Sequence, residues 1–247
     1  MEHVEVERHD RVAVVTIVDH ERRNAMTARM VDEIVETFDA LEADDDVGAV
    51  VVTGAPPAFC SGADTSALGA LSEGRDAQER GQVRSIYEGF LRVLRSSLPT
   101  VAAVNGPAVG AGCNLALACD VRIAGTAARF DTRFLKIGLH PGGGHTWMLE
   151  RAVGPQAAAV MVLFGRALDG EAAARAGLAW ACVADDVLVD TAVELAAGAA
   201  KAPKELVART KATLQRVPWQ PDFDAAIAFE VEHQAWSLGQ GWFGRRS

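Results

Sequence analysis

The amino-acid sequence predicts an α/β protein in which a core of strand–strand–helix units is followed by C-terminal helices. Continuous apolar runs typical of buried strands alternate with helical periodicity in the first part of the chain, and the pattern is mostly helical from about Pro155 onward. Such alternation is typical of layered α/β cores. We therefore expect a ββα core that holds the functional site over residues 1–190 and a helical region over residues 191–247.

The first ββα unit is expected within residues 4–44. The segment "VEVERHDRVAVVTIVD" is rich in Val, Thr and Ile and predicts two short strands around a turn at His9–Asp10. A helix is expected over "TARMVDEIVETFDALEAD", with Thr27 as its N-cap. Apolar residues spaced for one face of this helix are Met30, Ile34, Phe38 and Leu41.

The later elements follow from the same two patterns. Apolar strands are expected in residues 47–54, 99–106 and 120–131, and a helix over residues 74–98. The polar segment 69–81 is expected to be a mobile stretch of the surface. Further helices are expected over residues 155–165, 169–177, 186–203 and 222–238.

Composition and charge exclude several classes of function. The 247 residues carry a formal net charge of −9, whereas a nucleic-acid binder would show a basic stripe. The first ten residues are charged, and no apolar run approaches the roughly 20 residues that span a membrane. We therefore expect a cytoplasmic protein with no nucleic-acid or membrane partner. Reduced thiols and no metal site are expected, because the cysteines form no CxxC pair: Cys60, Cys113, Cys119 and Cys182.

Two glycine-rich segments directly follow predicted buried strands. They are "VVVTGAPPAFCSGADTSALGA" and "VNGPAVGAGCNLALACD"; a third glycine cluster lies at residues 138–146. None of the three is a P-loop or a dinucleotide-binding fingerprint. Glycines at such junctions commonly serve tight turns and close packing. Two junctions with free N–H groups could instead converge on one negatively charged oxygen, as an oxyanion hole requires.

These segments, together with three others, carry a resemblance to a known family. The further motifs are "RRNAM", "ARF" followed by "IGLHPGGG", and "AAARAGLAWACV". The combination of "SGAD" with "VNGPAVGAG" and "LALACD" resembles the enoyl-CoA hydratase/isomerase, or crotonase, family over almost the whole chain. The resemblance implies a crotonase-like spiral of ββα units, with a C-terminal helical region that builds trimers and often hexamers.

The resemblance also implies an acyl-CoA substrate, with coenzyme A entering as part of that substrate and no separate cofactor. It implies that the thioester carbonyl is held by the backbone N–H groups of Ala63 and Ala111. Small residues are needed around Ala111 because large side chains would block the thioester. Residues expected to contact the substrate are Arg23, Ala25, Ser61, Asp64 and Gly110. Arg22 and Arg23 could bind phosphates, or could form a solvated basic pair, and Asp64 is expected to hold its loop.

Two positions depart from the family pattern. Hydratases of the family add water with two glutamates, and the resemblance places these at Asn114 and Phe134. An amide is not a base and a phenyl ring carries no proton. Each acid or base contributes about 10²–10⁴ in rate, so hydration is expected to be impaired. The sequence leaves open a decarboxylase or isomerase on the same scaffold, or a non-catalytic acyl-CoA-binding protein.

Titratable residues near these positions are possible substitutes. Asp131 precedes Phe134 by three residues, an odd offset that on a straight strand predicts the opposite face and hence a surface or helix-capping role. His140 lies in a loop that borders the acyl pocket in relatives, and imidazole titrates near neutral pH. His145 could cap the next helix or face the pocket. Tyr87 is expected to be structural.

The late helices predict self-association. Their apolar faces include Phe223, Ile227, Val231 and Trp236, and exposed patches of this kind usually mark interfaces. We expect a homotrimer or a dimer of trimers. Relatives continue past the helix ending near "WSLGQGWF" with another helical stretch that contributes to a neighbour's CoA site, whereas this sequence ends at "GRRS".

Overall fold

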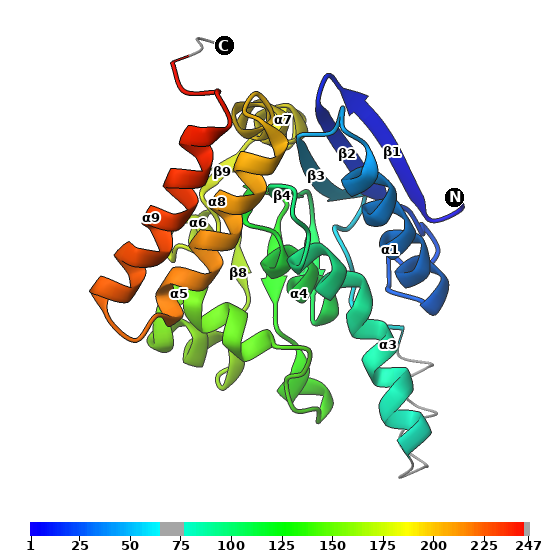
Figure 1. Ribbon diagram of the computed structural model, residues 1–247. Helices are drawn as coiled ribbons and strands as arrows, with labels where there is room; N and C mark the ends of the chain where they lie inside the picture. The colour runs from blue at the N-terminus through cyan, green and yellow to red at the C-terminus, as the bar shows by residue number, and fades with distance from the viewer. Residues whose placement is uncertain (65–76, 245–247) are drawn as a thin grey trace.

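The computed structural model describes residues 1–64 and 77–244, apart from the side chains of residues 77–85. Its centre is a six-stranded sheet in the order β1-β2-β3-β4-β6-β9, in which only the first pair is antiparallel. Figure 1 shows β1, β2 and β3 of this sheet side by side at the upper right of the molecule. The strands are β1 (Val4–His9), β2 (Val12–Ile17), β3 (Ala49–Gly54), β4 (Thr100–Val104), β6 (Val121–Gly125) and β9 (Ala181–Val183).

A second, three-stranded sheet lies beside the first. Its order is β5-β7-β8, from Pro107–Val109, Arg129–Asp131 and Leu168–Asp169. The pair β5–β7 is parallel and places Val109 opposite Asp131. Because β5 leads directly into α4 (Ala111–Ala118), this small sheet fixes where that helix begins.

Helices cover both faces of the main sheet. The helix α7 (Leu188–Ala200) packs its small and apolar face on one side of the central strands. On the other side lie α1 (Ala28–Ala43), α3 (Ala77–Leu94) and α4. Burial on two faces explains why every residue of β3 and β4 is buried and why these strands read as continuous apolar runs. The remaining helices are α5 (His145–Val162), α6 (Gly170–Arg175), α8 (Lys204–Arg216) and α9 (Phe223–Gly239), with short 3-10 turns at Phe134–Ile137, Asp185–Val187 and Val217–Trp219.

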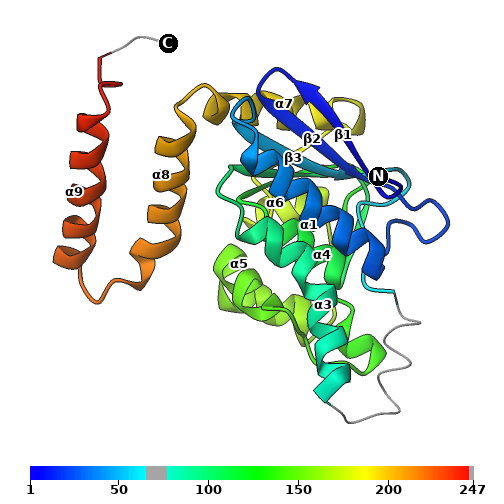
Figure 2. The same cartoon turned by 45° about the vertical axis from the view of Figure 1, so that its right-hand side comes forward.

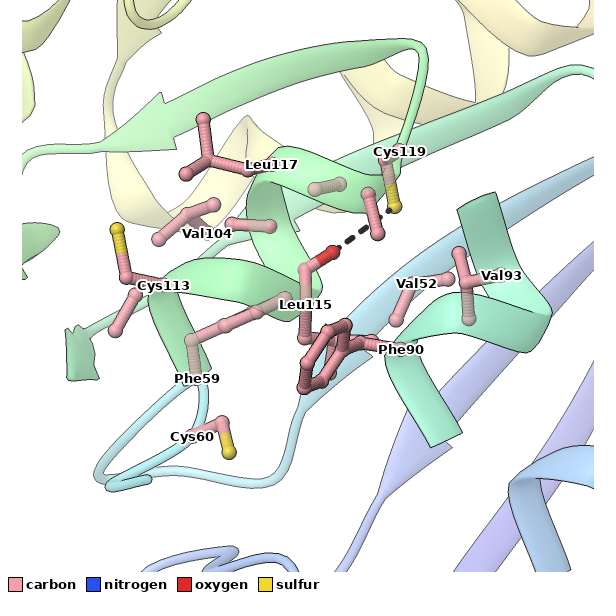
Figure 3. Packing of buried hydrophobic residues seen from close by; sticks show 14 of the residues in the cluster. Val52, Phe59, Cys60, Phe90, Val93, Val104, Cys113, Leu115, Leu117 and Cys119 are labelled. Carbon is pink, nitrogen blue, oxygen red and sulfur yellow. Dashed lines mark hydrogen bonds between the residues drawn. The ribbon is translucent and has the colours of Figure 1, made fainter. Parts of the chain in front are cut away.

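Helix α4 lies inside the core, and all eight of its residues are buried. Figure 3 shows Leu115 of this helix beside Phe90 of α3, with Phe59 and Cys60 on the approaching loop. A helix surrounded by core on every side needs small or apolar residues all round. Asn114 is therefore exceptional as a buried polar side chain, with 1 % of its surface exposed.

The hairpin of α8 and α9 stands away from the core, as Figure 2 shows. No residue of α9 is buried, and Lys211 is the only buried residue of α8. The exposed apolar side chains of α9 include Phe223, Ile227 and Val231, which were expected on its apolar face. Within the described ranges, no helix combines the length and the apolar character needed to cross a membrane.

Most predicted elements are confirmed. Thr27 is the N-cap of α1, and its side chain accepts a hydrogen bond from Met30 N at 3.2 Å. The strand expected over residues 120–131 is wrong as one element, since β6 and β7 are separate and belong to different sheets. The helix expected from Pro155 is confirmed as the second part of α5: Gly154, with φ +73° and ψ +169°, is not helical and divides α5 into two helices. Part of the polar segment 69–81, residues 69–76, lies outside the described residues.

Candidate active site

The two glycine-rich loops lie against each other. Cys60 N donates to Pro107 O at 3.1 Å, and Val109 N donates to Cys60 O at 3.0 Å. A Cβ built on Gly112 would lie 2.1 Å from Cys60 O, so only glycine permits this approach of α4 to the loop. Gly112 is thus required by close backbone contact between the two glycine-rich loops, which follow neighbouring strands.

The loop that contains Ala63 is fixed by a short ladder with Met26. Met26 N donates to Gly62 O at 2.8 Å, and Asp64 N donates to Met26 O at 3.2 Å. This ladder uses the residues on either side of Ala63, so the N–H of Ala63 points away from it. Asp64 therefore holds its loop through its backbone N–H, in line with the role expected for it.

Ala111 is the first residue of α4, after Gly110, whose φ is +53°. The first N–H groups of a helix have no partner within the helix. Neither the Ala111 N–H nor the Ala63 N–H has a hydrogen-bond acceptor among the described residues. Both residues line one cavity, and a Cβ built on Gly62 would lie 4.0 Å from Ala111 N. The two N–H groups expected to form an oxyanion hole therefore border the same space.

That cavity has a volume of about 380 Å³ and a mostly apolar wall. Among the described residues, no carboxylate side chain lines it. Its lining residues are Ser61, Gly62, Ala63, Ile86, Tyr87, Val109, Gly110, Ala111, Asn114, Thr132, Arg133, Phe134, Ile137, Leu139, His140 and Gly142. All five residues proposed for the catalytic positions are thus brought together: Ala63, Ala111, Asn114, Phe134 and His140.

Asn114 is a polar residue in the lining of the cavity. Its Nδ2 donates to Gly142 O at 3.1 Å, and its Oδ1 lies 2.5 Å from Nδ1 of His145. His145 is 1 % exposed, and burial lowers the pKa of its imidazole to about 4. The imidazole is therefore neutral at physiological pH. Its Nε2 is buried and has no hydrogen-bond partner among the described residues.

The two roles expected for His145 are both wrong. Gly144 is the N-cap of α5, and the His145 side chain makes no cap bond. Nor is His145 among the residues that line the cavity; its ring packs against that of Phe134, with the two ring centroids 4.9 Å apart in an edge-to-face arrangement. Sequence reasoning missed its link to Asn114, because nothing local marks a pair 31 residues apart.

The surface position expected for Asp131 is also wrong. Asp131 is 2 % exposed, and its carboxylate accepts hydrogen bonds from Arg133 Nε and the Arg133 backbone N, the latter at 3.0 Å. The helix-capping role is not confirmed either, because the N-cap of the 3-10 turn is Arg133 and the bond from its backbone N to Asp131 spans only two residues. Lys136 completes an ion pair with the same carboxylate at 3.5 Å. Asp131 is thus a structural anchor beneath the cavity wall.

His140 and Tyr87 both line the cavity. His140 is exposed, and its Nδ1 lies 2.8 Å from Pro141 O, so Nδ1–H donates and Nε2 is left to face solvent or substrate. Tyr87 was expected to be only structural. Burial raises the pKa of its phenol, which therefore stays protonated. A Cβ on Gly142 would lie 2.3 Å from the Tyr87 hydroxyl, so glycine leaves room for that group.

A second cavity, of about 330 Å³, adjoins the first and is basic. Arg23, Arg129 and Arg133 line it, and Ser61 borders both cavities. Arg23 adopts a positive φ of +51°. Ala25, expected to contact substrate, is 8 % exposed and lines neither cavity.

The cysteines do not form a nucleophile or a metal site. Burial raises the pKa of Cys60, Cys113 and Cys119 to about 12, so these thiols remain protonated. Across the described part of the chain, no group of three or more His, Cys, Asp and Glu side chains could hold a metal ion.

Comparison with known proteins gives a consistent result. The family model for enoyl-CoA hydratase/isomerase matches residues 7–234. The chain is 57 % identical over 210 residues to a probable enoyl-CoA hydratase, EchA14, of Mycobacterium tuberculosis, covering 85 % of this chain and 79 % of that protein. It is 35 % identical over 193 residues to 1,2-epoxyphenylacetyl-CoA isomerase of Escherichia coli, covering 78 % and 74 %.

Solved structures agree with these sequence relatives. A putative enoyl-CoA hydratase from Thermobifida fusca, solved in complex with CoA, superposes with a TM-score of 0.85 at 31 % identity, covering 96 % of this chain and 93 % of that one. A putative enoyl-CoA hydratase/isomerase from Mycobacterium abscessus gives a TM-score of 0.87 at 31 % identity, covering 97 % and 92 %. The crotonase fold implied by the sequence motifs is thereby confirmed.

Proposed function

Because the chain belongs to the enoyl-CoA hydratase/isomerase family, we propose that it acts on acyl-CoA thioesters and stabilises a thioester enolate with two backbone N–H groups. The observation that carries this proposal is the pair Ala63 and Ala111. Both N–H groups border one cavity and lack an acceptor among the described residues. Donors that are already in place stabilise the charge that develops on the thioester oxygen, and losing one typically costs about 10²–10³ in rate.

The lining of the cavity favours a reaction that needs no carboxylate base. Asn114 and Phe134 occupy the positions implied for the two glutamates, and no described lining residue supplies another carboxylate. Decarboxylation of a malonyl-type thioester meets this condition. The electron pair of the breaking C–CO2 bond moves into the enolate, carbon dioxide leaves, and a proton from water then adds to the α-carbon.

Coenzyme A needs no bound cofactor beside it, since it enters as part of the substrate. The basic second cavity supports a place for its phosphates, because guanidinium groups bind phosphate oxygens well. Arg23 and Arg129 line that cavity with Arg133. Ser61, shared by both cavities, marks the passage from this basic region to the thioester.

Replacement of Ala111 by proline tests the proposed oxyanion pair. Proline is well tolerated at the first position of a helix, so Ala111→Pro removes one N–H while α4 can still form. The matched control, Ala111→Ser, keeps the N–H. On malonyl-, enoyl- and 3-oxoacyl-CoA esters, we expect Ala111→Pro to lower any turnover about 10²-fold relative to Ala111→Ser.

Two outcomes would contradict the proposal. Equal turnover by the two variants would remove Ala111 from the oxyanion hole. Tight binding of the esters by the unmodified protein, with no turnover of any of them, would instead favour a non-catalytic acyl-CoA-binding protein.

A further inference from the structure

The side-chain amide of Asn114, which lines the cavity, has a fixed orientation. Asn114 Nδ2 lies 3.1 Å from the Gly142 carbonyl, which can only accept a hydrogen bond. The amide nitrogen therefore faces Gly142, and Oδ1 faces Nδ1 of His145 at 2.5 Å. Two acceptors do not share so short a contact, so the network assigns the proton of the neutral imidazole to Nδ1 and a lone pair to Nε2.

This orientation leaves one N–H of Asn114 for the cavity. Nδ2 carries two hydrogens and Gly142 takes one of them, while no other described residue accepts from this nitrogen. Asn114 lies three residues after Ala111 on α4, and both residues line the cavity. Residues three apart share one face of a helix at about 5–6 Å. An acyl group whose carbonyl oxygen binds Ala111 N–H therefore extends past Asn114.

The imidazole has no other polar role in the described structure. Its Nε2 is buried without a described partner, and the ring packs edge-to-face against Phe134, which lines the cavity. A buried polar atom without a hydrogen bond costs free energy. The one polar contact that offsets this cost is the bond from His145 to Asn114.

We propose that His145, together with the Gly142 carbonyl, is a positioning residue that holds Asn114 as a hydrogen-bond donor to the substrate, so that the site selects acyl thioesters with an acceptor oxygen near the thioester carbonyl. A 3-oxoacyl group has such an oxygen, whereas a saturated hydrocarbon chain does not. If the Asn114 amide were rotated by 180°, Oδ1 would face the substrate oxygen. Both atoms are hydrogen-bond acceptors, so no bond would form. This inference rests on the proposed function, because it takes the thioester to be bound at Ala63 and Ala111.

Binding of two esters that differ at one oxygen tests the inference. Acetoacetyl-CoA has the acceptor at C3 and butyryl-CoA lacks it, and neither has a double bond that could be hydrated. We expect the unmodified protein to bind acetoacetyl-CoA about tenfold more tightly by titration calorimetry, the effect of one well-made hydrogen bond. In His145→Phe, only the Gly142 carbonyl is left to orient the amide, so this ratio should fall toward one; His145→Asn, which keeps a donor near the Nδ1 position, should restore part of it.

The matched control is His233→Phe on α9. His233 also has a buried ring nitrogen, Nδ1, without a described partner and an edge-to-face aromatic neighbour, Phe229, but it does not line the cavity. Its substitution should leave the ratio unchanged. Asn114→Leu removes the donor itself and should also bring the ratio to one, so it tests the inference should His145→Phe fail to fold.

Each result bears on one of the two proposals. A tenfold ratio that persists in His145→Phe, or in Asn114→Leu, overturns the role of the pair. A ratio of one in the unmodified protein, with both esters bound, overturns the inferred substrate class but leaves the proposed function standing. Absence of binding for both esters overturns the proposed function and this inference with it.

Discussion

The imidazole Nδ1 of His145 lies 2.5 Å from Asn114 Oδ1, at the place where the family resemblance implies a glutamate base. The pair is neutral, because burial lowers the pKa of His145 to about 4 and an amide does not ionise. At this position the cavity lining thus has a fixed N–H donor, Asn114 Nδ2, where the resemblance implies a carboxylate. An amide in place of a carboxylate changes which reactions and acyl groups the site can favour. The protonation state of the His145–Asn114 pair can be measured directly.

The protonation of His145 is the first prediction. We expect its imidazole to be neutral from pH 8 to pH 5, with the proton on Nδ1, because Nδ1 donates to Asn114 Oδ1 and burial disfavours the charged form. Long-range proton–nitrogen NMR spectra of uniformly nitrogen-15-labelled protein distinguish the two tautomers. Assignment comes from the loss of the signals in His145→Phe. A proton on Nε2, or titration near pH 6.5, would contradict the geometry.

Stability against pH gives the second prediction. Below pH 6.5 the unfolded His145 takes up a proton while the folded one does not until about pH 4, so the unfolded state binds more protons and stability falls as pH falls. Between pH 6.5 and 5 this amounts to about 1.5 kcal/mol. The carboxylates with lowered pKa values, Glu33 and Glu42 among them, lose their contribution only at lower pH.

Urea unfolding at pH 6.5 and pH 5 measures this effect. In His145→Phe, the part of the fall in the free energy of unfolding that comes from His145 should be missing, whatever the stability of this variant at neutral pH. An identical loss of stability in the two proteins over this range would show that His145 does not titrate as expected.

Contact between the two loops gives the third prediction. In Gly112→Ala the new Cβ would lie 2.1 Å from Cys60 O, so α4 must shift away from the loop that holds Ala63. We expect a loss of about 1–3 kcal/mol in the free energy of unfolding and weaker binding of acyl-CoA esters. Gly198→Ala on α7 is the control, since nothing lies within 4 Å of its Cβ, and it should stabilise the helix by about 0.5–1 kcal/mol. If Gly112→Ala and Gly198→Ala changed the free energy of unfolding in the same direction, the close contact between Gly112 and Cys60 O would not explain the need for glycine.

The sequence predicted the parts of the site that depend on neighbouring residues. Thr27 as N-cap follows from local chemistry, and Ala63 and Ala111 bordering one cavity follows from loops after neighbouring parallel strands. The error at Asp131 came from treating residues 131–134 as a straight strand. The strand β7 ends at Asp131 and Arg133 adopts a φ of +59°, so alternation no longer decides which way these side chains point.

The contributions of Tyr87 and His145 could not be predicted from local patterns. Tyr87 reaches the cavity from α3, and its position depends on how that helix packs beside α4. His145 meets Asn114 only because Gly143 and Gly144 turn the chain with φ values of +65° and +80°. Such pairings are decided by tertiary structure, and one sequence contains no periodic signal for them.

Assembly is the fourth prediction. The side chains of Phe223 and Val231 on α9 are 78 % and 55 % exposed, and the α8–α9 hairpin stands away from the core. Exposed apolar faces of this kind usually mark interfaces. We expect light scattering to give three or six times the 26.1 kDa mass of the chain. The double variant Phe223→Asp/Val231→Asp should lower the mass, whereas Val6→Asp on β1 should not; a monomeric mass for the unmodified protein would refute the expectation.

The last prediction concerns hydration. Asn114 and Phe134 stand at the positions implied for the two glutamates, and among the described lining residues no carboxylate is placed to activate water. We expect the unmodified protein to hydrate crotonyl-CoA at least about 10²-fold more slowly than a hydratase that has both glutamates, the low end for one missing acid or base. Loss of the ultraviolet absorbance of the enoyl thioester measures the rate.

Restoring both carboxyl groups is the companion experiment. Asn114→Glu/Phe134→Glu should raise the rate more than either single change, because one group must take a proton from water while the other delivers a proton to the α-carbon. The Phe134 change also places a carboxyl group beside His145, whose ring now packs against the phenyl ring. If the unmodified protein already hydrates crotonyl-CoA at ordinary rates, the assignment of these two positions is wrong. His140, which lines the cavity with Nε2 free of any described partner, then becomes the first residue to replace.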